Sequence, residues 1–176
     1  MTARASIATI FLTMALVSLA GAMTSLINSK SSIEYPFWFF VLFFMMLRTK
    51  MYLDDLRDFK TAPKLRWGIV IGIISWFFWV LSAANIRSIE ESAGILALAI
   101  FVATVALLYT CIVNGFKRMH YGWFLLNIIY MTILLVLWAG PGICLLWKAG
   151  ILIIGIVTTV IDFYISDSLA IIDEMK

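Results

Sequence analysis

Charge is scarce in this chain of 176 residues. Charged residues make up 13% of the sequence and hydrophobic residues 64%. In an ordinary soluble domain about a quarter of the residues are charged and about half are apolar. A soluble fold of this length has too little interior to hide so much apolar surface. We therefore expect an all-α fold, a polytopic transmembrane helical bundle that forms a single membrane domain over residues 1–176.

The middles of the apolar runs lack ionisable residues. They contain no Asp, Glu, His, Lys or Arg. Proton-coupled pumps and most ion-coupled carriers need such a group inside the membrane, so these classes are disfavoured. No constellation of nucleophile, base and oxyanion donor is visible either, and we expect no catalytic residues and no enzyme activity.

Metal-ligating residues and thiols are also few. His120 is the only histidine, whereas a metal site needs several converging ligands, so we expect no metal and no cofactor. We assign His120 to a basic loop over 116–120. Cys111 and Cys144 both lie inside apolar runs, which predicts buried free thiols. A net charge of +3 without a basic face argues against direct binding of nucleic acid.

Six apolar runs are long enough, or nearly so, to cross a hydrocarbon core of about 30 Å. The second run opens with Pro36 in a first-turn position and meets no breaker before Pro63. We expect it to continue to about Lys60, so that its last turns stand in the cytoplasm. The breaker at 140–142 is either a turn between two spans or a kink. The predicted spans are 5–27, 36–53, 67–85, 93–113, 123–139 and 143–165, and Asn114-Gly115 is expected to end the fourth helix by C-cap chemistry.

The basic residues are distributed unequally between the two sides of this arrangement. Six spans place ten of the thirteen Lys and Arg residues on the side of the N-terminus, and leave Lys30, Arg87 and Lys148 on the other. Because cytoplasmic loops carry the excess of Lys and Arg, both termini are predicted to be cytoplasmic. The predicted location is the inner (plasma) membrane of a bacterial type of cell. With a kink at 140–142, the number of spans would be odd and the C-terminus would lie outside.

Small residues recur at spacings of four in the first span and along one side of the fourth. Such spacing lets helix backbones approach closely in lipid. We expect these faces to pack in the bundle or to join copies of the chain in a homo-oligomer. The predicted packing interface comprises Ser18, Gly21, Ala22, Ser25, Ala99 and Ala103.

The one long polar interval, residues 48–66, is the predicted cytoplasmic loop. Tyr52, Leu56 and Phe59 share a helix face there, and this face must rest on the same chain, a second subunit, the lipid surface or a soluble partner. Its carboxylates lack the glycine-rich loop or second acidic motif of a metal site, so a solvated helix face is favoured. The predicted partner-binding residues are Tyr52, Asp54, Asp55, Leu56, Arg57 and Phe59.

Two polar residues lie near the ends of spans. Lys148 could contact an anion or lipid headgroup, but a lysine whose ammonium extends along the helix to the membrane surface is favoured. Asn127 could line a pore, although a hydrogen bond between helices is the favoured use. A pore would require a polar stripe that faces one lumen. The candidates for that stripe are Thr9, Thr13, Asn127 and Thr132.

These observations favour a non-enzymatic membrane protein. The leading hypothesis is an oligomeric membrane scaffold or sensor subunit that engages a cytosolic protein, such as a component of defence or immunity. The alternative is a small oligomeric channel or facilitator for an ion or small solute. An intramembrane enzyme is the least favoured class, because no catalytic constellation is visible.

Overall fold

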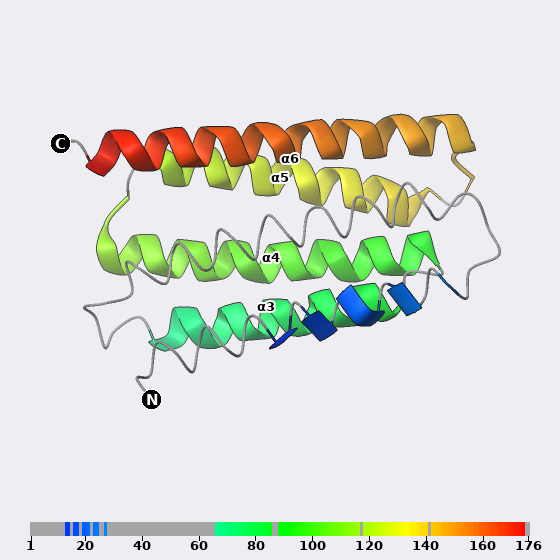
Figure 1. Cartoon of the computed structure of the whole chain (residues 1–176), viewed down its shortest axis with the longest axis horizontal. Coiled ribbons are helices and arrows are strands. Elements are labelled where there is room, and N and C mark those ends of the chain that lie inside the picture. Colours follow the sequence, from blue (N-terminus) through cyan, green and yellow to red (C-terminus); the bar gives the residue numbers. More distant parts are fainter. Residues whose placement is uncertain are drawn as a thin grey trace.

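The computed structural model describes residues 66–85, 88–116, 118–140 and 142–174, together with ten residues between 13 and 27. The chain is helical in these ranges and contains no strand there, which confirms the all-α part of the predicted fold class. The helices labelled in Figure 1 lie side by side, with neighbours in the chain running in opposite directions. Their bounds are α3 Arg66–Ala84, α4 Ile89–Asn114, α5 Arg118–Ala139 and α6 Leu145–Glu174.

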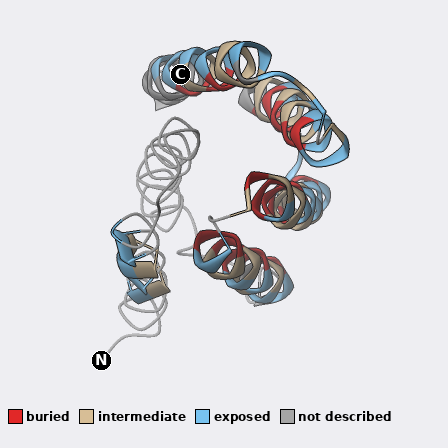
Figure 2. Cartoon of the chain, turned by 90° about the vertical axis from the view of Figure 1, so that its right-hand side faces the viewer, coloured by how far each residue is buried: buried red, intermediate tan, exposed pale blue. Residues whose placement is uncertain are grey.

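Each of these helices packs on the next one along the chain. Seen end-on, α3, α4, α5 and α6 form an arc in chain order, with the buried residues gathered toward its inside (Figure 2). Helix α4 contributes the most to the core, where Leu96 and Ile100 are almost completely buried. Tyr130 and Leu134 of α5 and Leu152 of α6 continue the same cluster, and Met14 of the first apolar run packs against it.

Local signals in the sequence determine where α4 begins and ends. The Ser88 hydroxyl caps the first turn by accepting a hydrogen bond from the Glu91 backbone N–H at 3.3 Å. Glu90 and Glu91 in that turn complement the positive end of the helix dipole. Gly115 ends the helix with a φ of 88°, a conformation that a side chain would strain. The helix end predicted at Asn114-Gly115 is therefore confirmed.

The breaker at 140–142 forms a turn between two separate helices and not a kink. Helix α5 ends at Ala139, and the Ile143 N–H donates to the Gly140 carbonyl at 3.1 Å. The Cys144 carbonyl then accepts from the N–H groups of Trp147 and Lys148, each at 3.1 Å, in the first turn of α6. Because of this turn, α6 packs antiparallel to α5.

Several helices extend beyond the apolar runs that predicted them. Helix α4 begins at Ile89, α5 begins at Arg118, and α6 continues to Glu174. Hydropathy marks only the apolar part of a helix, while Glu, Arg and Lys are good helix formers that prolong it. His120 was consequently assigned wrongly to a loop, since it lies in the first turns of α5 and is only 6% exposed.

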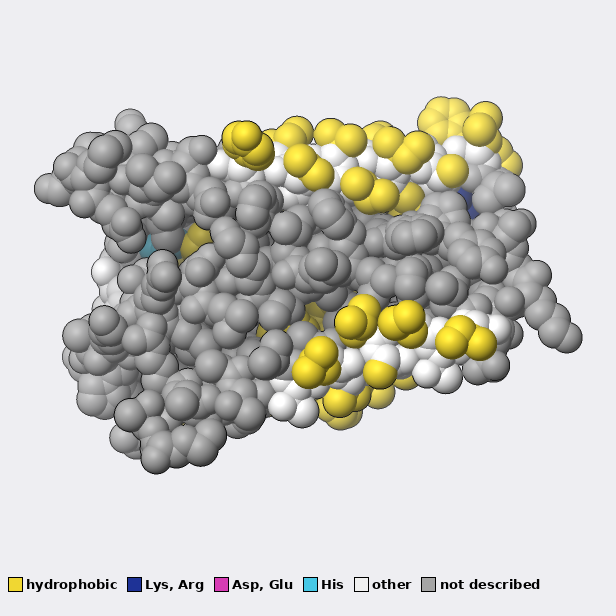
Figure 3. Space-filling model, viewed as in Figure 1, with side chains coloured by type: hydrophobic (Ala, Val, Ile, Leu, Met, Phe, Trp, Pro, Cys, Tyr) yellow, Lys and Arg dark blue, Asp and Glu magenta, His cyan; other side chains and the backbone are white. Residues whose placement is uncertain are grey.

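Large apolar side chains cover the outside of the four helices, and polar side chains lie within. On α4 the exposed residues recur at helical spacing. Figure 3 shows apolar side chains along the described parts of one face. Two helices, Ile89–Asn114 and His120–Ala139, are long and apolar enough to cross a membrane, and Val70–Ala84 and Leu146–Ile161 are shorter apolar helices. The exposed α4 residues are Leu98, Phe101, Val105, Leu108 and Ile112.

Candidate functional site

Buried serines join α3 to α4. The Ser82 hydroxyl donates to the Ser92 carbonyl and the Ser92 hydroxyl to the Ser82 carbonyl, each at 2.9 Å. The two hydroxyl oxygens are themselves 2.9 Å apart. Two turns along α3, the Ser75 hydroxyl donates to the Ala99 carbonyl at 2.7 Å. Serine is small enough to let the two backbones approach and polar enough to hydrogen-bond across the gap.

Helix α5 is held by polar contacts to both of its neighbours. The Asn127 side-chain amide donates to the Thr104 hydroxyl of α4 at 3.0 Å, and this hydroxyl donates to the Ile100 carbonyl. One turn later, the Tyr130 hydroxyl donates to the Thr159 hydroxyl of α6 at 3.0 Å. The hydrogen bond between helices that was favoured for Asn127 is thus confirmed. These contacts set the rotation of α5 between α4 and α6.

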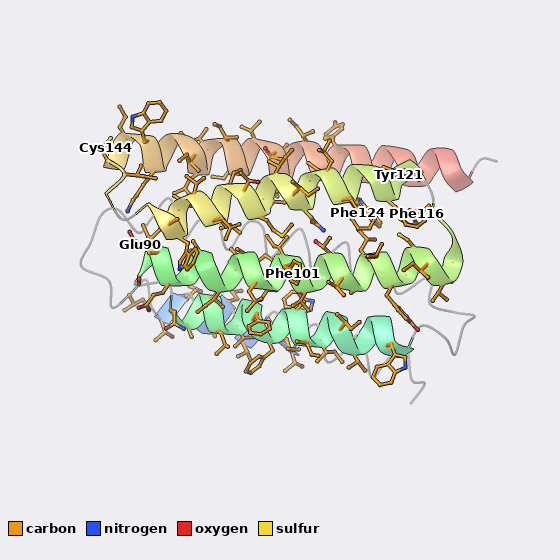
Figure 4. The ribbon with its side chains drawn as sticks, turned by 180° about the vertical axis from the view of Figure 1, so that it is seen from behind. Glu90, Phe101, Phe116, Tyr121, Phe124 and Cys144 are labelled. Atoms are coloured by element: carbon orange, nitrogen blue, oxygen red, sulfur yellow. The ribbon has the colours of Figure 1, made fainter. Side chains whose placement is uncertain are left out.

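An ion pair lies at the end of the molecule where α3 meets α4 and α5 meets α6. The Lys148 ammonium is 2.7 Å from Glu90 Oε1. The side chain of Lys148 is 11% exposed and that of Glu90 33% exposed. The favoured reading, that the Lys148 ammonium extends along its own helix to the surface, is therefore wrong, because the ammonium contacts a carboxylate on α4. Figure 4 shows Glu90 and Cys144 together at this end.

Aromatic side chains gather at the opposite end, where α4 connects to α5. The Phe116 ring lies 5.8 Å from the Tyr121 ring and stacks on the Phe124 ring at 6.3 Å (Figure 4). Close by, the His120 ring is 5.8 Å from the Trp123 ring. Phe116 and Tyr121 are exposed. Lys117 and Arg118 follow Phe116 in the sequence, so this end combines aromatic residues with basic ones.

The arrangement suits structural connection better than chemistry. The interior hydroxyls and the Asn127 amide bond to one another across helix contacts, or to backbone carbonyls of their own or a neighbouring helix. Among the described residues, no group of three or more His, Cys, Asp or Glu could hold a metal ion. Cys111 is a buried free thiol, as predicted, whereas Cys144 is free but exposed, because it lies in the turn before α6. The prediction that Cys144 is buried was therefore wrong.

The predicted packing residues have different surroundings. Ala99 of α4 is fully buried within the chain and accepts the hydrogen bond from Ser75, so it contributes to the α3–α4 contact. Ala103 is partly buried. Gly21 is also partly buried, and a methyl group added there would meet nothing within 4 Å. The remaining members, Ser18, Ala22 and Ser25, lie outside the described residues.

The two pore candidates on α5, Asn127 and Thr132, do not share a face of that helix. Asn127 is 2% exposed and points to α4, whereas Thr132 is exposed and donates to the Ile128 carbonyl of its own helix. Thr13 of the first apolar run is exposed. Thr9 lies outside the described residues.

The predicted cytoplasmic surface belongs to a part of the chain that the structure does not describe. The helix expected over 36–60 and the loop 48–66 fall almost entirely in that part. All the predicted partner-binding residues lie outside the described residues, namely Tyr52, Asp54, Asp55, Leu56, Arg57 and Phe59.

Sequence reasoning missed two of the central contacts. Nothing in the local sequence links Glu90 to a lysine 58 residues away. Ser82 and Ser92 did leave a signal, because each is a small polar residue inside or beside an apolar run. Such residues mark helix contacts in lipid, but they do not identify their partners. No family model, curated protein or solved structure matches this chain.

Proposed function

We propose that this chain is a multi-pass helical membrane protein that serves as a scaffold or sensor subunit. One observation carries the membrane assignment: large apolar side chains face outward along every described helix, while serine, threonine and asparagine side chains are buried between the helices. Soluble monomers rarely expose contiguous apolar patches larger than a few hundred Å². A lipid bilayer solvates an apolar outer surface of this kind, and it favours polar contacts that are buried between the helices.

The proposed arrangement has six spans in the inner (plasma) membrane and both termini in the cytoplasm. The Lys148–Glu90 distance of 2.7 Å supports it, because the arrangement places both residues near the same, outer side of the membrane. The aromatic cluster at Phe116 supports it as well, because aromatic residues beside Lys117 and Arg118 suit a cytoplasmic membrane surface. Two of the proposed spans, α4 and α5, contain a helix that is long and apolar enough to cross a membrane.

The scaffold role is supported by how the chain uses its polar groups. In the described helices, the buried hydroxyls and the Asn127 amide connect neighbouring helices. None of these contacts forms the nucleophile and base of a reacting centre. The proposed role is accordingly a non-enzymatic one. The cytosolic partner is proposed to bind through the loop 48–66, whose Tyr52, Leu56 and Phe59 need a surface to cover them.

The homo-oligomer is proposed to form through the first apolar run. Ala99 is buried within the chain, and its carbonyl accepts a hydrogen bond from Ser75. The fourth span therefore offers a second copy of the chain fewer small residues than its sequence indicated. Gly21 has open space next to it, which leaves room for a neighbouring helix.

The native thiol of Cys144 allows a direct test of the membrane arrangement. In a Cys111→Ser variant, a membrane-impermeant maleimide should label Cys144 on intact cells, because the proposal places the α5–α6 turn outside. The matched control is Phe116→Cys with both native cysteines changed to serine, and it should react only after permeabilisation. Labelling of both sites from outside, or of neither after solubilisation of the membrane, would overturn the proposed threading.

Native mass spectrometry distinguishes the scaffold proposal from the channel proposal. The protein is extracted in detergent and purified through a C-terminal tag. A discrete homo-oligomer that carries a soluble protein, cross-linked to residues 48–66, supports the scaffold or sensor function. A protein without any partner contradicts it. Ion flux in liposomes that disappears in Asn127→Leu and Thr132→Leu would instead establish the channel.

A further inference from the structure

The polar contacts that hold α6 differ from those that hold the other helices. Helices α3 and α4 share three buried serine hydrogen bonds. Between residues 146 and 161, helix α6 buries a narrow stripe of Leu152, Gly155 and Thr159, and the helix packs on α5. The other side chains of this segment are exposed or only partly buried. Polar side chains connect α6 to other helices at Tyr130–Thr159 and at Glu90–Lys148.

Those two contacts act at different heights on the helix. Thr159 lies in the middle of α6 and is held by its neighbour α5. Lys148 lies in the first turns and reaches past α5 to α4. It stands on the same face as the buried stripe, at helical spacing of four from Leu152. The ion pair therefore connects the first turns of α6 to α4, while Tyr130 of α5 contacts α6 near its centre.

Helix α6 is also long enough to connect the two sides of a membrane. It runs without interruption for 30 residues. At 1.5 Å per residue this is about 45 Å, compared with a hydrocarbon core of about 30 Å. A displacement of its first turns is therefore transmitted along a continuous helix to its last turns.

We propose that the Glu90–Lys148 ion pair is a latch that holds the outer end of α6 on α4, and that α6 pivots about the Tyr130–Thr159 contact when the latch opens. This proposal rests on the proposed sensor function and identifies α6 as the helix that moves. Opening the latch moves the cytoplasmic turns of α6, on the side where the loop 48–66 is proposed to bind its partner. The attraction between the two opposite charges stabilises the state in which the first turns of α6 are held on α4.

The test measures distances between spin labels on the full chain in lipid nanodiscs. The native Cys144 reports the outer end of α6, because its carbonyl caps the first turn. The second label is Leu98→Cys on the exposed face of α4, in a Cys111→Ser background. In Glu90→Gln and Lys148→Met the Cys144–Leu98 distance should lengthen by about 2–5 Å, the scale of known helix shifts. The exchange Glu90→Lys with Lys148→Glu should restore the short distance.

A second pair of labels reports the pivot. Val160→Cys replaces Cys144, which becomes serine, and is measured against Leu98→Cys. Val160 adjoins Thr159, so this distance should stay unchanged in the same variants. An unchanged Cys144 distance, a change of both distances, or failure of the charge exchange to restore the short distance would each overturn the latch. If the unaltered protein is absent from the membrane fraction, the proposed function itself fails, so the two failures are distinguishable.

Discussion

The ammonium nitrogen of Lys148 lies 2.7 Å from the Glu90 carboxylate, although 58 positions separate the two residues in the chain. This pair joins α4 to α6, two helices that both pack on α5, which lies between them. The burial of the pair is unequal, because the lysine side chain is 11% exposed and the glutamate side chain 33% exposed. That asymmetry determines what removing each partner should do.

Glu90→Gln should lower the free energy of unfolding by about 1–2 kcal/mol, between the values for exposed and buried pairs. The reason is that it leaves an ammonium group largely buried without its counter-ion. Lys148→Met should cost less, because the remaining carboxylate is better solvated. Thermal unfolding in detergent measures both variants. Glu91→Gln is the matched control, since it removes an exposed acid from the same helical turn. An equal loss in Glu91→Gln and Glu90→Gln would assign the effect to the helix dipole instead.

Ser82→Ala and Ser92→Ala should each destabilise the α3–α4 contact by about 0.6–1.7 kcal/mol, from the average to the maximum measured for hydrogen bonds between membrane helices in double-mutant cycles. Each substitution removes a donor to the partner's backbone carbonyl. The double variant should lose less than the sum, because the two hydroxyls share one contact. Thr158→Ala is the control, as its hydroxyl bonds only to the Ile154 carbonyl of its own helix. Full additivity in the double-mutant cycle would contradict the shared contact.

Gly94→Ala should destabilise the protein by about 1–2 kcal/mol, as overpacking generally does. An added methyl group would lie 2.7 Å from the Trp138 ring, so the ring must move. Shortening the neighbour with Trp138→Leu should remove most of this loss. Gly150→Ala is the control, because nothing lies within 4 Å of the added group and alanine is the better helix former. A Gly94→Ala variant as stable as Gly150→Ala would place the Trp138 ring elsewhere.

Asn127→Leu and Thr132→Leu should behave differently, although both are polar residues of α5. Asn127 is buried and bonded to Thr104 across the helix contact, so its loss should lower stability by about 0.5–1.5 kcal/mol. Thr132 is exposed and bonds within its own helix, so Thr132→Leu should stay within about 0.5 kcal/mol of the unaltered protein. Chemical unfolding in detergent measures both. Similar losses from the two substitutions would indicate that both residues face the interior.

Local patterns in the sequence were sufficient for the helical class, for the helix end at Asn114-Gly115 and for the use of Asn127 between helices. Those features depend on neighbouring residues, because apolar length, capping and breakers act within a few turns. The apolar runs were less informative about helix ends, because α5 and α6 continue into residues that hydropathy does not mark. His120 was misassigned for that reason.

The sequence by itself determined that the chain is helical, predominantly apolar and poor in groups for chemistry. Only the tertiary structure decided which side of each helix faces inward. It paired Lys148 with Glu90 and Ser82 with Ser92, placed Ala99 inside the chain, and set Asn127 and Thr132 on different faces. The physical reason is that the inner and outer faces of these helices are both apolar. Hydrophobic periodicity therefore leaves the rotation of each helix open, and contacts between residues far apart in the chain determine it.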